Sequence, residues 1–427
     1  MKRFDHTTIA GTAIIAMCIS IMPSAPLMAE GVDDSQLVVV TEDVAFGPDG
    51  CDAISIFDLR NPSPLFRGAP RISPGRLAAT SDFETVLAVN SNIVGTDSFL
   101  YLLRRDDLDR TDWRSEAAIL GANFHLNGGI AIGPDDDTLL VTTTPHFPNY
   151  IARPGPASVE TYLLSEVSGN RIGPSHGVFV LDSPAAEILF DDTGSLAHIL
   201  TVAGSVRTID TSLMIDVAAP IEGPLPTVSG FPPGRAPAEY FHASLSPDGR
   251  TMIANRWHGR GVTAFNLKDR TATTIDLPAA MVGGVAFNHA ESNHGLLAVH
   301  EDVQVVVYRF DPPGTLTELS QLRIARPVIP NRGAAEPFGP LASIAWSGDG
   351  THLIAATDMG RAEFQVLSVT EEGGLLTAER FLTACPLSDG NRNLANDILT
   401  SNRLRPPTST PSPTPSPTAT SPATNTA

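Results

Sequence analysis

Lysine is almost missing from this chain of 427 residues, in which only Lys2 and Lys268 occur. Over the whole chain, 28 basic side chains stand against 47 acidic ones, and the net charge at pH 7 is −19. Nucleic acids and anionic membrane surfaces attract proteins that are rich in basic side chains. We therefore expect no nucleic-acid partner for a chain with this charge.

Cysteine is scarce as well, and the three that occur are Cys18, Cys51 and Cys385. Because no C-x-x-C spacing is present, the usual cysteine-pair zinc sites and c-type haem attachment are excluded. The sequence also has no Walker loop, no HExxH motif and no EF-hand loop. It therefore predicts no cofactor and no metal site.

Two local matches to chemical motifs have plainer interpretations. The tripeptide Asp135–Asp137 and the group around Asp106 are acidic enough for calcium, but no flanking pattern completes a site, so we interpret them as solvated turns. The segment Gly173–Gly177 fits G-x-S-x-G. A nucleophile elbow needs a strand before the serine and a helix after it, and here a polar loop precedes it and an apolar strand-like run follows. We interpret this match as chance.

Long apolar runs are absent except at the start of the chain. There, Lys2 and Arg3 precede the apolar stretch Ile9–Met22, and a small residue, Ala29, follows. This order is typical of a cleaved signal peptide, and the apolar stretch is short for a membrane span. We expect a protein exported to the periplasm or the medium, with a mature chain that begins near Glu30 and has no transmembrane segment. An uncleaved anchor is the alternative.

What the sequence does contain is a repeated strand and turn pattern, clearest in Tyr240–Leu267. An apolar run ends at Ser246–Gly249, a Ser-Pro-Asp-Gly sequence typical of a tight turn. A second strand follows at once, and after a glycine-containing turn a third strand, Val262–Leu267, alternates apolar and polar residues. Strand, turn, strand, turn, strand is the inner part of a propeller blade.

Seven such units occur along the chain. They begin at or near Leu37, Leu77, Gly129, Ala186, Tyr240, Gly284 and Ala342. Each unit is too small to bury its own faces, so neighbouring units must stack, and a closed ring leaves few open edges. The first unit is one strand short, and Asn393–Thr400 supplies a strand from the C-terminal end. The sequence therefore predicts an all-β fold: a seven-bladed β-propeller, its ring closed by a C-terminal strand.

The predicted domain organisation follows from composition. Residues 1–29 form the signal peptide and residues 30–405 the propeller. Residues 406–427 form a disordered tail of Pro, Ser, Thr and Ala, with a single Asn, Asn425, and no charged or aromatic side chain. We expect a monomer. Cys51 and Cys385 lie near the two ends of the propeller, so ring closure brings them into the same or adjacent blades, and export permits a disulfide between them.

The repeat from Tyr240 to Leu267 closely resembles the YVTN-type repeat of bacterial β-propellers and their lactonase-like relatives. In those relatives an Asn-Arg pair ends the second strand, and here the pair is Asn255–Arg256. The resemblance implies that Arg256 helps to hold an anionic ligand, a role that suits a permanently charged, bidentate guanidinium. The paired-His motif of the lactonase relatives is missing, since the sequence around His125 reads NFHLNGG.

Four residues form the candidate ligand site: Arg256, with His242, Glu239 and His125, which stand before or within predicted inner strands. Our first functional hypothesis is an exported binding or scaffold module for a protein or a small ligand. The alternative is a lactonase-like hydrolase or isomerase acting on an anionic small molecule in the central channel, with His242 or Glu239 as acid or base. Catalytic residues are not assigned. A redox partner like the propeller subunit of amine dehydrogenases is a third hypothesis that no residue favours.

Overall fold

The structure is a computed structural model, and it describes residues 33–45, 53–68, 74–90, 99–105, 113–119, 125–144, 157–167, 172–183, 185–224, 242–256, 261–278, 282–301, 304–312, 314–324, 343–358, 362–382 and 392–404. The chain divides into two compact units, Met1–Gly31 and Val32–Ala427. All described residues belong to the second unit.

The described strands form seven antiparallel sheets, which we number as blades 1 to 7 and whose strands run from the inner to the outer edge. Blade 1 consists of β29 (Arg392–Thr400), β1 (Leu37–Ala45), β2 (Ala53–Asp58) and β3 (Asn61–Gly68). Blade 2 consists of β4 (Pro74–Ala79), β5 (Thr85–Asn90), β6 (Phe99–Arg105) and β7 (Trp113–Ile119). Blade 3 consists of β8 (His125–Ile132), β9 (Thr138–Thr144), β10 (Ala157–Leu163) and β11 (Gly177–Leu181). Blade 4 consists of β12 (Ala185–Phe190), β13 (Leu196–Thr201), β14 (Ser205–Asp210) and two short strands on β14, β15 (Ile215–Asp216) and β16 (Ile221–Glu222). Blade 5 consists of β17 (Ala243–Leu245), β18 (Thr251–Asn255), β19 (Val262–Asn266) and β20 (Thr271–Ile275). Blade 6 consists of β21 (Val282–Phe287), β22 (Leu296–Glu301), β23 (Gln304–Asp311) and β24 (Thr315–Arg323). Blade 7 consists of β25 (Ile344–Trp346), β26 (His352–Asp358), β27 (Ala362–Val369) and β28 (Leu375–Leu382).

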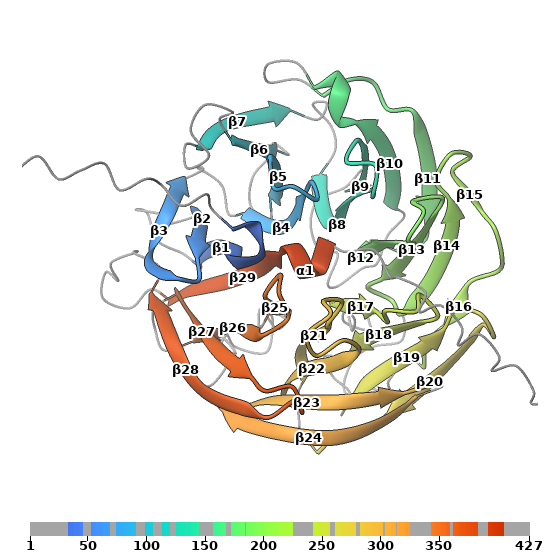
Figure 1. Ribbon diagram of the computed structural model, residues 1–427. Coiled ribbons are helices and arrows are strands. Elements are labelled where there is room, and N and C mark those ends of the chain that lie inside the picture. The colour runs from blue at the N-terminus through green and yellow to red at the C-terminus, as the bar shows by residue number, and fades with distance from the viewer. Residues whose placement is uncertain are drawn as a thin grey trace, which may run out of the picture. The chain divides into compact units, whose positions relative to one another are not determined.

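The seven blades form a ring around a central axis (Figure 1). Their inner strands contact one another in the order β29, β4, β8, β12, β17, β21 and β25, and β25 returns to β29. This closed order confirms the prediction of an all-β, seven-bladed β-propeller.

A strand from the C-terminal end closes the ring. β29 pairs antiparallel with β1, from Val38 opposite Thr400 to Ala45 opposite Arg392. In turn β1 pairs with β2, so blade 1 combines the two ends of the propeller. The predicted pairing of Asn393–Thr400 with the first unit is confirmed, and the N-terminal strand of the ring becomes the second strand of its blade.

The turns between the first and second strands of the blades define one face of the ring, which we call the turn face. In blade 5, the Asp248 carboxylate accepts hydrogen bonds from the Ser246 hydroxyl and the Arg250 backbone N–H. The next residue, Gly249, has φ +68°, a left-handed conformation that glycine adopts without strain. The opposite face, where the second strand of each blade leads to the third, we call the loop face.

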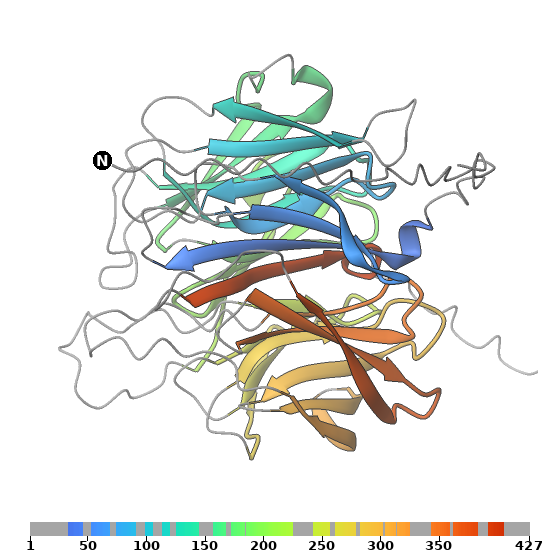
Figure 2. The ribbon, with the colours of Figure 1, turned by 90° about the vertical axis from the view of Figure 1, so that its left-hand side faces the viewer.

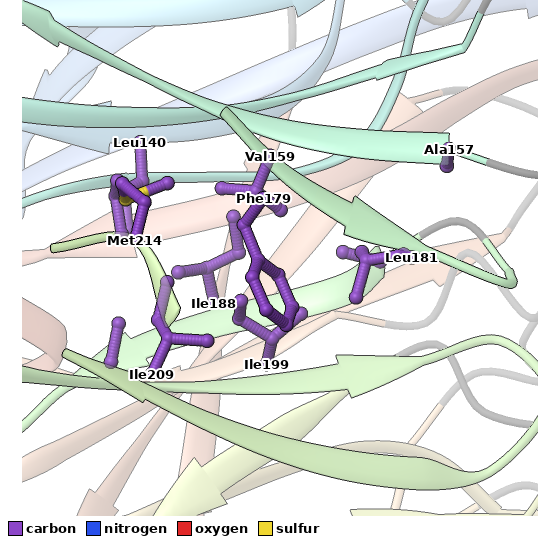
Figure 3. Packing of buried hydrophobic residues seen from close by; sticks show 12 residues of the cluster. Leu140, Ala157, Val159, Phe179, Leu181, Ile188, Ile199, Ile209 and Met214 are labelled. Carbon is purple, nitrogen blue, oxygen red and sulfur yellow. The ribbon is translucent and has the colours of Figure 1, made fainter. Parts of the chain in front are cut away.

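Apolar layers between neighbouring blades form the core. Between blades 3 and 4, Phe179 of β11 packs with Ile199 and Ile209 of blade 4, and Met214 packs beside them (Figure 3). Each fully buried side chain of this kind stabilises the fold by about 1.5–3 kcal/mol relative to exposure. Each sheet extends beyond the three strands of the repeated pattern to a fourth, outer strand, and outer strands such as β24 consist of exposed and half-buried residues.

The described helices are short: η1 (Asp34–Gln36), η2 (Leu164–Glu166) and α1 (Ser401–Leu404). η1 and α1 both lie on the turn face, because the Gln36 side chain bonds to Asp349 in the first turn of blade 7 and Asn402 bonds to the first turn of blade 6. Figure 2 shows the ring from the side. Within the described ranges, no helix has the length and apolar character needed to cross a bilayer.

Candidate functional site

A small cavity lies on the ring axis, with a volume of about 120 Å³. Inner strands of the blades line it, mostly with apolar side chains such as Ile130, Val285 and Trp346. Asn402 and Arg403 of α1 also line it, and Figure 1 shows α1 near the centre of the ring. Pockets for drug-sized ligands measure about 300–1,000 Å³. This part of the channel is therefore too small for a large substrate, and α1 lies at its turn-face end.

A cluster of charged side chains, which we call the channel cluster, crosses the channel. Its members are Arg76, Glu187, His242, Asp397 and Arg403. They come from blades 2, 4, 5 and 1 and from α1. Among the described residues, two guanidinium groups pair with two carboxylates, and such pairing is what permits charges to be buried.

Asp397, on the closing strand β29, is fully buried. Its Oδ2 accepts a hydrogen bond from the backbone N–H of Leu77 at 2.9 Å, and its Oδ1 accepts one from Nη1 of Arg403 at 2.7 Å. The hydroxyl of Ser343 in blade 7 donates to the same Oδ1 at 3.3 Å. One carboxylate thus fastens the closing strand to the blades on both sides of it.

Arg403 reaches from α1 across the channel. Its Nη2 donates to Oε1 of Glu187 at 3.0 Å, and Glu187 is 3% exposed. Burial alone would lower the pKa of the Arg403 guanidinium, but the charges of Asp397 and Glu187 outweigh burial and raise that pKa further above its usual range. Arg403 therefore stays charged and ties blade 4 to the closing strand.

His242, just before β17, meets the cluster through Arg76. Nη1 of Arg76 lies 2.8 Å from Nδ1 of His242 and 3.5 Å from Oε2 of Glu187. A guanidinium has only donors, so Nδ1 must be the acceptor and the neutral ring carries its proton on Nε2. Arg76 thus fixes the tautomer of His242.

The backbone of His242 is held just as firmly. Its N–H donates to Oδ1 of Asn255 at 2.8 Å, and its carbonyl accepts from the Asn255 N–H at 3.0 Å. Nδ2 of Asn255, which is fully buried, donates to the carbonyl of Val282 in blade 6. The Asn of the Asn-Arg pair therefore fixes the loop-face end of β17 and joins two blades.

Arg256 follows β18 at the same loop-face end of blade 5 as His242. It is 9% exposed, and its Nε is buried with no hydrogen-bond acceptor. In the described part of the chain, no carboxylate forms an ion pair with its guanidinium. His242 lines the central cavity and Arg256 does not, because inner strands line the channel and Arg256 follows the second strand of its blade.

Other predicted residues fall partly or wholly outside the described chain. Glu239, Cys51 and Cys385 lie outside it, and so does the side chain of His125, whose backbone begins β8 opposite Thr144. The predicted disulfide between Cys51 and Cys385 stays a prediction.

The carboxylates of the acidic turn Asp135–Asp137 accept hydrogen bonds from other residues of the protein. Asp135 accepts from Thr138, and these hydrogen bonds outweigh burial and hold the pKa of its carboxyl below the usual range. Asp136 accepts from Ser81 and Asp137 from Ser165. The group around Asp106 lies outside the described residues. Within the described ranges, no three His, Cys, Asp or Glu side chains are placed to hold a metal ion.

The G-x-S-x-G match has an equally local explanation. Ser175 lies in a loop before strand β11, and its hydroxyl donates to the carbonyl of Gly177 at 3.0 Å. A strand, not a helix, follows the serine, so the geometry of a nucleophile elbow is not present.

Sequence reasoning missed four members of the channel cluster: Arg76, Glu187, Asp397 and Arg403. Two of them carried a usable signal, because Glu187 and Asp397 are lone carboxylates inside otherwise uncharged inner-strand sequences, AAEILF and NLANDILT. A lone charge on a strand that lies at the axis of a propeller must find a partner there. Arg403 carried no such signal, since it adjoins the polar tail.

Comparison with known proteins gives a fold and no family. No family model matches the chain, and no curated protein matches it. Among solved structures, a protein of unknown function from Desulfotomaculum acetoxidans is 14% identical with a TM-score of 0.56, covering 85% of this chain and 99% of its own. A proposed 6-phosphogluconolactonase from Bacteroides fragilis is 15% identical with a TM-score of 0.53, covering 86% and 98%. The WD40 domain of Toxoplasma gondii coronin is 11% identical with a TM-score of 0.50, covering 73% and 71%. At these identities the similarity extends to the fold alone.

Proposed function

We propose that this β-propeller is an exported binding module whose ligand is a small organic anion held by Arg256. The observation that carries the proposal is the guanidinium of Arg256, which is 9% exposed and has an Nε without an acceptor. Burying an ion without a partner costs several kcal/mol, so buried arginines are normally paired. A bound carboxylate or phosphate supplies the missing partner.

The chemistry around Arg256 suits an anion with hydroxyl groups. Guanidinium groups bind carboxylate and phosphate oxygens with two parallel hydrogen bonds. His242, at the same end of blade 5, is held as the tautomer with a proton on Nε2, which is a donor. Sugar acids and their phosphates offer both an anionic group and hydroxyl acceptors, so they are the ligand class that we propose.

Catalysis by a lactonase-like hydrolase or isomerase is the second candidate, and the similarity to the proposed 6-phosphogluconolactonase favours it. The hydrogen bonds of the channel cluster favour binding over catalysis. Both of its carboxylates, Glu187 and Asp397, already accept hydrogen bonds from arginines, so neither is placed to act as a general base. A scaffold that binds a protein is the remaining alternative.

Calorimetric titration tests the proposal with four probes: 6-phosphogluconate, gluconate, citrate and inorganic phosphate. In Arg256→Gln we expect the affinity for the tightest probe to fall about 10- to 100-fold, because a hydrogen bond to a charged group contributes about 1.5–3 kcal/mol. The matched control is Arg250→Gln, which changes an exposed arginine at the other end of β18 and leaves the affinity unchanged.

Stability separates ligand binding from a structural role. If Arg256 has no partner in the protein, Arg256→Gln keeps or raises the melting temperature of the unliganded chain. If Arg256 bridges blades through a carboxylate, the variant loses about 3–5 kcal/mol. Loss of stability together with no binding of any probe overturns the proposal. Release of acid from a lactone probe by the wild type, lost in Arg256→Gln, establishes the enzymatic alternative.

A further inference from the structure

We infer that the C-terminal turn Ser401–Leu404 positions the loop-face site from the opposite face of the ring, through a chain of alternating charges that runs from Arg403 to His242. This inference rests on the proposed function, since it makes Arg403 and Arg76 positioning residues for the anion site. It concerns a segment at the turn face, whereas the site lies at the loop face.

The chain of contacts has three links. Arg403 Nη2 lies 3.0 Å from Glu187 Oε1, and Glu187 Oε2 lies 3.5 Å from Arg76 Nη1. Arg76 Nη1 lies 2.8 Å from Nδ1 of His242. Each link joins a different part of the ring: α1, blade 4, blade 2 and blade 5. A change at the C-terminal turn therefore reaches blade 5 without passing through the strands between them.

Asp397 provides a parallel route. Its Oδ1 lies 2.7 Å from Arg403 Nη1 and 3.8 Å from Arg76 Nη1. Both carboxylates of the channel cluster thus have the same two cationic neighbours, and both side chains are at most 4% exposed. With little water to screen these charges, the loss of one cation leaves two carboxylates to attract the other.

Loss of the Arg403 charge therefore changes the contacts of His242. In the intact cluster, Arg403 shares the attraction of Glu187 and Asp397, and Nη1 of Arg76 remains close to the imidazole. Without the charge of Arg403, Arg76 is drawn toward the two carboxylates and its bond to Nδ1 of His242 is lost. The imidazole then loses the donor that makes Nδ1 an acceptor, so Arg76 no longer favours the tautomer with a proton on Nε2, the donor to the proposed anion.

Nitrogen NMR of the histidine rings tests this inference in the unliganded full-length chain. The protein is labelled with ¹⁵N-histidine, the ring signals of His242 are assigned with His242→Gln, and spectra are recorded where free imidazole is neutral. In the wild type we expect Nδ1 of His242 as an unprotonated, hydrogen-bonded nitrogen and the proton on Nε2. In Arg403→Met we expect the Nδ1 signal to shift and both tautomers to appear, and Arg403→Lys to restore most of the wild-type spectrum.

The controls make each outcome informative. Arg309→Met removes an exposed arginine and leaves the His242 signals unchanged. If Arg403→Met does not fold, Arg403→Gln removes the same charge while keeping a hydrogen-bond donor for Asp397, and the same shift is expected. A His242 spectrum that is identical in wild type and Arg403→Met, or a wild-type ring with its proton on Nδ1, overturns the inference.

Anion binding supplies the second measurement. We expect Arg403→Met to weaken the tightest probe of the calorimetric titration by about fivefold or more, the usual scale of coupling between two sites. The two proposals fail separately. If Arg403→Met leaves the His242 spectrum unchanged while anion binding still depends on Arg256, only the inference is wrong. If the His242 spectrum responds to Arg403→Met but no probe binds, the proposed function is wrong.

Discussion

Replacing Asp397 with asparagine removes the charge that fastens the closing strand. In the structure, Asp397 accepts hydrogen bonds from the Leu77 backbone in blade 2 and from Ser343 in blade 7, and it pairs with Arg403. Asparagine keeps the size of the side chain and one acceptor oxygen. It leaves Arg403 and Arg76 with Glu187 as the remaining carboxylate of the channel cluster.

The expected loss of stability in Asp397→Asn follows from the burial of the cluster. Removing one member of a buried charge cluster destabilises a protein by about 3–5 kcal/mol, because the remaining charges stay buried without it. The entropy of unfolding is about 2.1 cal/mol/K per residue, so for a ring of this length the melting temperature of Asp397→Asn falls by about 4–6 °C.

Differential scanning calorimetry of the purified full-length chain measures this shift. The matched control is Asp182→Asn, whose carboxylate is 82% exposed and which we expect to change stability by less than about 0.5 kcal/mol. If Asp397→Asn melts within about 1 °C of the wild type, the channel cluster does not stabilise ring closure in the way that we describe.

Three further predictions follow from single residues. Burial lowers the pKa of His198 from 6.5 to about 4, with the charge of Asp191 opposing the shift. The unfolded chain therefore binds the extra proton first, and stability falls as the pH drops from about 6.5 to about 4; urea unfolding should show about 3 kcal/mol of this loss in the wild type and not in His198→Gln. Mass spectrometry without reduction should find Cys51 linked to Cys385 in the exported protein, and two free thiols would contradict the pairing. N-terminal sequencing of that protein should begin at or near Glu30, and a chain that begins at Met1 would contradict export.

The ring could be predicted from the sequence because its inner strands and first turns follow local rules. Apolar runs that end in an acidic or glycine-containing turn, such as Ser246–Gly249, recur in the seven units, and the incomplete first unit predicts the closing strand. The fourth strands could not be predicted in the same way. Strands such as β24 lie at the rim with water on much of their surface, so no regular apolar pattern distinguishes them from loops.

The candidate site could be predicted only in part. The resemblance of the central repeat led to Arg256, and the position of His242 at a predicted inner strand led to His242; the structure places both at the same end of blade 5. The partners of His242 could not be found in this way. Arg76 and Glu187 lie far from His242 in sequence, and only ring closure brings them together at the axis.

A crystal structure of the protein grown with 6-phosphogluconate tests the central claim most directly. We predict a phosphate or carboxylate oxygen within about 3.2 Å of Nε of Arg256, the upper range of a hydrogen bond to an N–H donor. A carboxylate of the protein itself bonded to that nitrogen, with no anion beside it, would contradict the proposal that Arg256 holds the ligand.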